Sequence, residues 1–134
     1  MTASRKSVFM RKLVVLMVLI AMLAVSATGT AAAGGAPPFP NIPGNWSHID
    51  INRKIGGKWH TLTLDRGRIA QVNAAQLTLR EADGTVQQIP LSPSTDVRIY
   101  GFPATIYQLR RLMFAMTMRI DGGPAVRIKV TRHL

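Results

Sequence analysis

Three histidines and six acidic residues are the side chains of this 134-residue sequence that could support acid–base or metal chemistry. His48 and Asp50 are two residues apart, so an extended backbone places them on one side, where His60 could join them. Zinc requires three or four converging ligands, and such a set would suit a sugar-directed or metal-assisted hydrolase. The sequence contains no HExxH motif and no cysteine. Because spacing alone is weak support, we predict no metal and no cofactor.

Nucleophilic catalysis has equally little support. Ser47, Ser92 and Ser94 are the serines beyond the N-terminal segment, and none lies in a G-x-S-x-G motif. The acidic residues fall mostly beside predicted turns, where aspartate satisfies the backbone. Since no nucleophile, base and orienting group occur together, we predict that the protein is not an enzyme.

The basic residues are the stronger functional signal. The formal charge is +11, from 17 basic and 6 acidic residues. Four basic residues and no acidic ones lie in residues 1–33, so the remainder carries 13 − 6 = +7. A charge of this size attracts polyanions, although charge runs also serve solubility alone.

The N-terminal segment has the three parts of a secretory signal peptide. Basic residues precede the apolar run Leu13–Ala27, and small residues follow it. We predict a signal peptide over residues 1–33, cleaved after Ala27 or Ala33, and a secreted or extracytoplasmic protein associated with the cell envelope. The alternative is an uncleaved N-terminal anchor, although the apolar run is shorter than the roughly 20 residues of a membrane span. The absence of cysteine excludes disulfides and a lipid-modified cysteine.

Residues 34–59 begin with "GGAPPFPNIPGN", a composition typical of an extended arm. A lead-in follows that contains Trp46 and Trp59. We expect the two indoles to fold back over an open end of the domain. They could instead stack on sugar rings or lie at a membrane surface.

Residues 60–134 alternate apolar and polar side chains with the period of β-strands. The alternation changes parity at Gly67, which predicts a bulge there. A stripe formed by Ile106, Leu109 and Met113 predicts one short helix. These features predict an all-β fold, a small five-stranded antiparallel barrel with one short helix, because closure leaves no exposed edge in a domain with little core.

The same alternation assigns cationic side chains to the outer face of that barrel and Phe114 to its interior. Like charges on neighbouring strands repel each other, and a bound polyanion relieves that repulsion. The predicted polyanion-binding residues are Arg80, Arg98, Arg119, Arg127 and Lys129.

Anionic wall polymers or lipid head groups fit the predicted compartment. Single-strand binders stack bases on outward aromatic side chains, and only Tyr100 is predicted to point outward, so nucleic acid is not the expected partner. Membrane attachment is expected only if the N-terminal segment stays uncleaved. The alternative function is a structural or protein-interaction module of the cell envelope.

Gly67–Val130 resembles a family of small exported bacterial domains of unknown function with an OB-like β-barrel. The shared pattern is G-x-I-x-x-V, an acidic-Gly turn, T-x-V, a helical turn with L-R, and G-P-A-x-x-I-x-V. The resemblance implies a fold and an export route, and it carries no catalytic residues. A glycine usually follows the L-R-x of the helical turn, where this sequence has Leu112.

Overall fold

The structure, a computed structural model, describes residues 35–132. The predicted signal peptide lies outside the described residues. The described part is all-β, as predicted. Within it no helix is long and apolar enough to cross a membrane.

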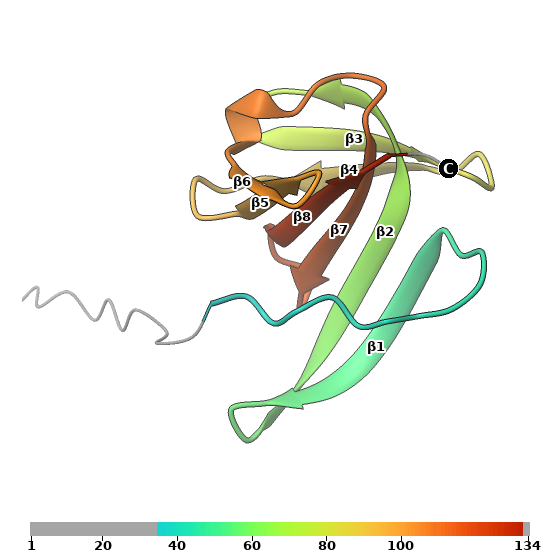
Figure 1. Cartoon of the computed structure of the whole chain (residues 1–134). Coiled ribbons are helices and arrows are strands. Elements are labelled where there is room, and N and C mark those ends of the chain that lie inside the picture. Colours follow the sequence, from blue (N-terminus) through green and yellow to red (C-terminus); the bar gives the residue numbers. More distant parts are fainter. Residues whose placement is uncertain (1–34, 133–134) are drawn as a thin grey trace, which may run out of the picture. The chain divides into compact units, whose positions relative to one another are not determined.

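Eight strands and one 3-10 turn make up this part of the chain (Figure 1). Ile106 and Leu109 are buried, as a helical stripe would be. However, the predicted helix is only this single 3-10 turn. The elements are β1 His48–Ile55, β2 Lys58–Val72, β3 Gln76–Glu81, β4 Val86–Pro90, β5 Asp96–Ile99, β6 Phe102–Ala104, η1 Ile106–Gln108, β7 Phe114–Ile120 and β8 Ala125–Thr131.

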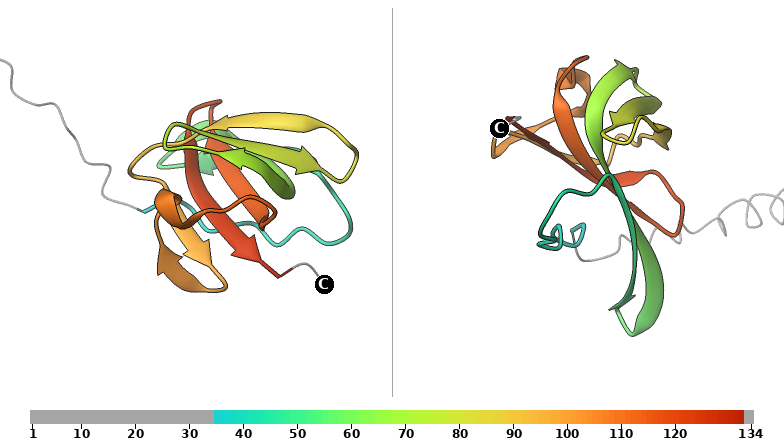
Figure 2. Two further views of the ribbon diagram at one scale, coloured as in Figure 1. Left: turned by 90° about the horizontal axis from the view of Figure 1, so that it is seen from above. Right: turned by 90° about the vertical axis from the view of Figure 1, so that its right-hand side faces the viewer.

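The strands form one sheet in the order β4-β3-β2-β7-β8-β5-β6, with β1 added to β2. Within residues 35–132 its hydrogen-bonded path ends at β4 and β6 and does not close. The described sheet thus differs from the predicted barrel in three respects: the path does not close, there are eight strands, and β5 pairs with β8 in parallel. The sheet also begins in the predicted lead-in, because β1 pairs with the first half of β2. This β1–β2 ribbon extends away from the other strands (Figures 1 and 2).

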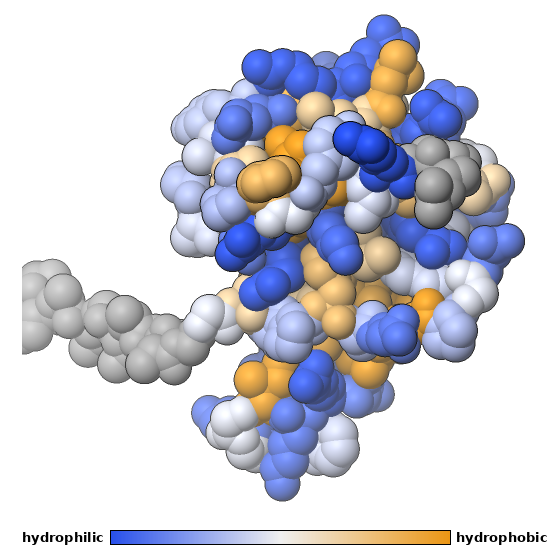
Figure 3. All heavy atoms as spheres, viewed as in Figure 1, coloured by the Kyte–Doolittle hydropathy of each residue, from blue (hydrophilic) through white to orange (hydrophobic). Residues whose placement is uncertain are grey.

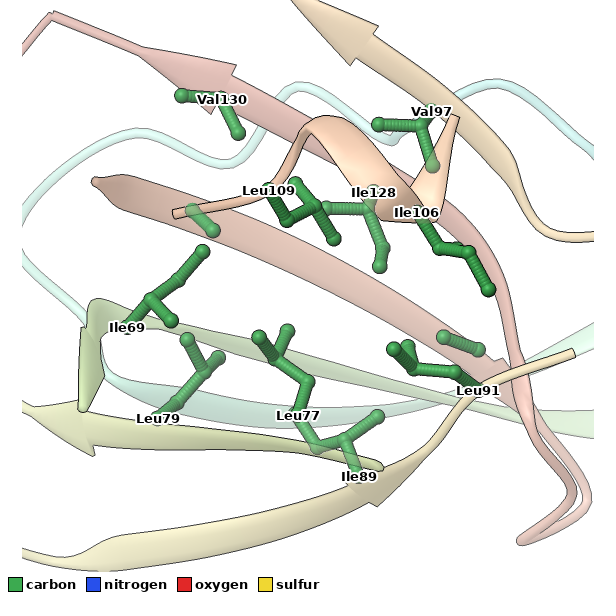
Figure 4. Close-up of a cluster of buried hydrophobic side chains, with 12 residues drawn as sticks. Ile69, Leu77, Leu79, Ile89, Leu91, Val97, Ile106, Leu109, Ile128 and Val130 are labelled. Atoms are coloured by element: carbon green, nitrogen blue, oxygen red, sulfur yellow. The ribbon is translucent and has the colours of Figure 1, made fainter. Parts of the chain in front are cut away.

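The main core lies between the curved sheet and η1 (Figure 4). The alternating leucines and isoleucines of β3, β4 and β8 point into it, as their sequence pattern predicted. Its fully buried aliphatic side chains include Ile69, Leu77, Leu79, Ile89, Ile128 and Val130.

A second, smaller core lies on the opposite face of β2. Leu62, Leu64 and Met118 are fully buried there. The Pro/Gly-rich arm covers them through Phe39, Ile42 and Trp46. Strand β2 therefore packs one face of its first half against the arm and the other face of its second half, through Ile69, into the main core.

These two cores explain the parity change at Gly67. The predicted bulge is not at this residue: the β2–β3 register is regular through Gly67 and shifts only between Ile69 and Gln71. The apolar side chains change parity because β2 buries one face before Gly67 and the opposite face after it. Glycine is required for another reason, since a Cβ here would lie 2.3 Å from the backbone oxygen of Arg80.

Strand β7 faces the opposite way from the sequence expectation. Ala115 and Thr117 are fully buried on the inner face, and Phe114 and Met116 lie on the outer face with Met118. The arm buries Met118 from outside, so the hydrophobic alternation of β7 marks the second core and not the main one.

Leu112 has a backbone conformation that is typical of glycine. Its φ is +73°, its side chain is 64% exposed, and its N–H donates to the Ile69 carbonyl at 2.8 Å. The left-handed conformation is unfavourable for residues with a Cβ, so this turn stores strain.

Gly67→Ala is expected to lower the free energy of unfolding by about 1–3 kcal/mol, because the added methyl group meets backbone atoms that cannot move independently. Urea denaturation measures this. Gly123→Ala is the control, since its Cβ would approach only the Ile120 carbonyl, at 3.2 Å, and should change stability by less than about 1 kcal/mol. Equal effects of the two substitutions would contradict the argument.

Leu112→Gly is expected to raise the free energy of unfolding by about 1 kcal/mol, because glycine adopts a positive φ without strain. Thermal denaturation is the measurement. Leu109→Ala, three residues earlier and buried, should instead lower stability by about 2–5 kcal/mol. A loss of stability in Leu112→Gly would show that the exposed leucine contributes more than its backbone strain costs.

Candidate functional site

Cationic side chains occupy neighbouring positions on the outer face of the sheet. Arg68 on β2 lies directly opposite Arg80 on β3, with Phe114 on its other side. In the next row, Arg66 and Lys129 both lie opposite Met116, and Lys129 lies opposite Arg98. We call Arg66, Arg68, Arg80, Arg98 and Lys129 the basic outer face.

Three of the predicted binding residues belong to this face. Arg80, Arg98 and Lys129 are exposed, and Arg98 has a long contact of 3.9 Å with Asp96. Arg127 shares the face but is held at its boundary. Its Nη2 donates to the Ala36 carbonyl at 2.7 Å and lies 3.5 Å from Asp96.

Arg119 is not on this face, so its predicted orientation is wrong. Its guanidinium is only 17% exposed and lies 3.2 Å from the buried carboxylate of Asp65, on the inner side of the sheet. The reversed orientation of β7 is the reason, because Arg119 shares its face with Ala115 and Thr117.

The sequence analysis missed Arg66 and Arg68. Both are at even-numbered positions, like Leu62 and Leu64, whose side chains the alternating pattern assigned to the interior of a barrel. The sequence signal was the Arg-Gly-Arg run itself, since two arginines in alternate positions are not expected in a small core.

Two hollows with aromatic walls border the basic outer face. One, of about 710 Å³, is lined by Trp46, Arg66, Phe114 and Arg132. The Arg66 guanidinium lies 4.4 Å from the Trp46 ring centroid, and its Nε donates to the Trp46 carbonyl at 2.8 Å. The other, of about 410 Å³, is lined by Tyr100, Phe102, Lys129 and Arg132.

Aromatic side chains therefore do lie beside the cations. Phe114, predicted to point inward, lies between Arg68 and Thr131 on the outer face. The placement of the aromatic side chains therefore does not exclude nucleic acid as a partner. Figure 3 shows hydrophilic side chains spread over the body with apolar surface between them.

A buried polar cluster lies on the inner face of the sheet. Asp65 is fully buried, and its two carboxylate oxygens accept from His48 Nδ1 at 2.6 Å and from Arg119 Nη2 at 3.2 Å. Glu81 is 4% exposed, and one ligand atom each from His48, Asp65 and Glu81 lie within 4.8 Å of one another. Among residues 35–132, these three side chains form the group that could hold a metal ion.

The cluster shifts the proton affinities of its members. Burial, followed by the adjacent Asp65 carboxylate, raises the pKa of Glu81 to about 7. The hydrogen bond to Asp65 raises the pKa of His48. Asp50 accepts a hydrogen bond from the Thr63 hydroxyl at 2.7 Å, and this bond is the largest cause of its lowered pKa.

The predicted set of His48, Asp50 and His60 does not converge. His48 Nε2 lies 3.4 Å from Asp50, but His60 pairs with Asp121 at 2.6 Å. His60 lies opposite Arg53 in the β1–β2 ladder, whereas His48 lies opposite Asp65. The hydrolase constellation considered above is therefore absent from the described residues.

The two tryptophans behave differently. Trp46 packs into the second core, in keeping with a covering role. Trp59 is 72% exposed near the end of the β1–β2 ribbon, beside the exposed cations Arg53, Lys54 and Lys58. It covers no opening of the domain.

Comparison with protein-family models, with curated proteins and with solved structures finds no match to this sequence. Functional inference for this protein accordingly comes from the geometry of its own residues.

Glu81→Gln is expected to weaken the dependence of stability on pH between 5 and 8. Because the folded pKa of Glu81 is about 7 and its ordinary value is 4.5, the folded state keeps a proton that the unfolded chain releases. Stability is therefore highest below about pH 4.5 and falls as pH rises through 7, by on the order of 2 kcal/mol. Glutamine stays neutral and removes this loss.

Urea denaturation at pH 5 and pH 8, with a chelator present so that only protons exchange, measures the difference. The raised pKa of His48 adds a loss in the same direction, which both chains retain. The same change in unfolding free energy in both chains would contradict the assignment.

Proposed function

We propose that this protein is an exported, non-enzymatic β-domain that binds anionic polymers of the cell envelope through its basic outer face. The observation that carries the proposal is the direct cross-strand pairing of Arg68 with Arg80, both exposed. Like charges placed opposite each other destabilise a sheet, so folding alone gives no reason for this arrangement, and a polyanion would stabilise it.

The surroundings of the face suit an extended anionic ligand. Arg66 on β2 and Lys129 on β8 lie in the adjacent row, on either side of Met116, and two hollows with aromatic walls border the face. Asp83 and Asp96 lie only at the margins, on the Ala82–Asp83 side of the larger hollow and beside Arg127. Export is supported by the three-part N-terminal sequence pattern.

The finer fold consistent with this function is an OB-like barrel of five strands, formed by β2, β3, β4 and β5 together as one interrupted strand, β7 and β8, with β1 and β6 as additions to it. Only residues 91–95 separate them. At one end of this connection the Leu91 N–H donates to the Ala75 carbonyl, and at the other Thr95 Oγ1 donates to the Ala125 carbonyl at 2.6 Å. The chain itself thus spans the gap between the β3–β4 side and the β8 side.

A second candidate, a protein-interaction module, is favoured by one separate observation. Strand β6 ends the sheet path, and Phe102 within it is 74% exposed beside the half-exposed Tyr100. An apolar edge strand is a pairing site for another chain. Binding through that edge would be insensitive to salt.

The double variant Arg68→Glu/Arg80→Glu is expected to reduce binding of the full chain to purified polyglycerol-phosphate wall polymer by at least about tenfold. Wild-type binding should fall roughly 10- to 100-fold between 50 and 200 mM NaCl, as expected for release of several counterions. Sedimentation with the polymer at both salt concentrations provides the measurement.

Arg110→Glu/Arg111→Glu is the matched control, because it changes the charge equally at exposed positions in the loop after η1. It should retain binding within about threefold, the residual effect of net charge. Equal losses in the two variants would reduce the effect to net charge and contradict the site. Binding to anionic vesicles or to single-stranded DNA in preference to the polymer would contradict the ligand class.

A further inference from the structure

The inner face of the sheet contains buried polar atoms that residues 35–132 leave without hydrogen-bond partners. Both carboxylate oxygens of Glu81 and the hydroxyl of Thr117 are among them. The Asp65 carboxylate lies beside Glu81. Buried polar groups normally have hydrogen-bond partners, so acceptor atoms gathered in this way suit an electropositive ligand.

Register places these groups around one point. Thr117 lies directly opposite Asp65, and Glu81 lies opposite Gly67, two residues further along the same face of β2. Because Gly67 has no side chain, nothing on β2 separates the two carboxylates. His48 approaches from β1, where it lies opposite Asp65.

We propose that His48 Nδ1, Asp65 and Glu81 form a binding site for one divalent transition-metal ion, with zinc as the representative ion. One imidazole and two carboxylates are a donor set that zinc accepts, and water or the Thr117 hydroxyl would complete the coordination. Arg119 lies 3.2 Å from Asp65 and offsets the charge of that carboxylate.

The groups around the candidate ligands orient them as in known metal sites. Asp50 lies 3.4 Å from His48 Nε2 and is itself held by Thr63, so that Nδ1 faces the cluster. A carboxylate behind the distal nitrogen of a ligating histidine is a recurrent feature of such sites. Arg119 holds one oxygen of Asp65 and leaves the other for the ion.

Binding requires the ligand atoms, which lie within 4.8 Å of one another, to adjust to the geometry of the ion. His48 Nδ1 and Asp65 Oδ1 are 2.6 Å apart, closer than the separation of about 3.3 Å between two ligands of tetrahedral zinc. The side chain of His48 is 39% exposed, so it can withdraw toward solvent. The proton between these two atoms leaves as the ion enters.

The experiment is isothermal titration of the full chain with ZnCl₂ at pH 7.5, with the thermal midpoint measured in parallel. One zinc per chain is expected, together with a rise in the thermal midpoint of about 4 °C or more at saturation. Glu81→Gln and His48→Ala should each weaken binding at least tenfold. Glu81→Gln introduces no buried charge, so it tests the site without a folding defect.

His60→Ala is the matched control, because His60 and Asp121 form an equally short pair at the surface without a buried third ligand. It should bind zinc within twofold of the wild type. The proposal is overturned if the wild type binds no zinc, if His60→Ala loses as much affinity as His48→Ala, or if Glu81→Gln binds as the wild type does. Equal competition by magnesium or calcium would overturn the transition-metal class.

Discussion

Strand β2 must bury opposite faces at its two ends, and the rest of the structure follows from this constraint. It pairs with β1, β3 and β7, so three of the other seven strands in the described part are positioned directly against it. Its first half packs Leu62 and Leu64 against the arm, and its second half packs Ile69 into the main core. The buried face of β2 changes around Gly67, where the backbone of β3 lies too close to leave room for a side chain.

The same change of buried face separates the cationic side chains of the domain from the acidic ones. On the outer face, Arg66 and Arg68 follow the leucines: Arg66 stacks on Trp46 at the end of the arm, and Arg68 is exposed beyond it. On the inner face, Asp65 enters the interior and is stabilised by His48 and Arg119. One strand therefore presents cations to solvent and a carboxylate to the interior within a few residues.

These two sites differ in how they relate to stability. The outer cations repel one another across the sheet, but solvent screens this repulsion enough for the domain to fold, and a bound polyanion would relieve the rest. The inner acids are desolvated, so each needs a positive partner. Asp65 has two such partners, whereas the Glu81 oxygens have no hydrogen-bond partner among residues 35–132. The first site suits reversible binding, and the second suits a permanently held ion or proton.

The sequence by itself determined the strand class, the aliphatic positions of the main core, and the exposure of Arg80, Arg98 and Lys129, because alternation with period two reports burial directly. It did not determine which side of a strand meets which core. Leu62 and Met118 are as apolar as any residue of the main core, yet the arm covers them from outside, so Arg119 and Phe114 were assigned to the wrong faces. It also did not bring Glu81 to Asp65, since they belong to different strands. Only the tertiary structure decided these points. Alternation in the sequence indicates that one face of a strand is buried, but not which part of the protein packs against that face.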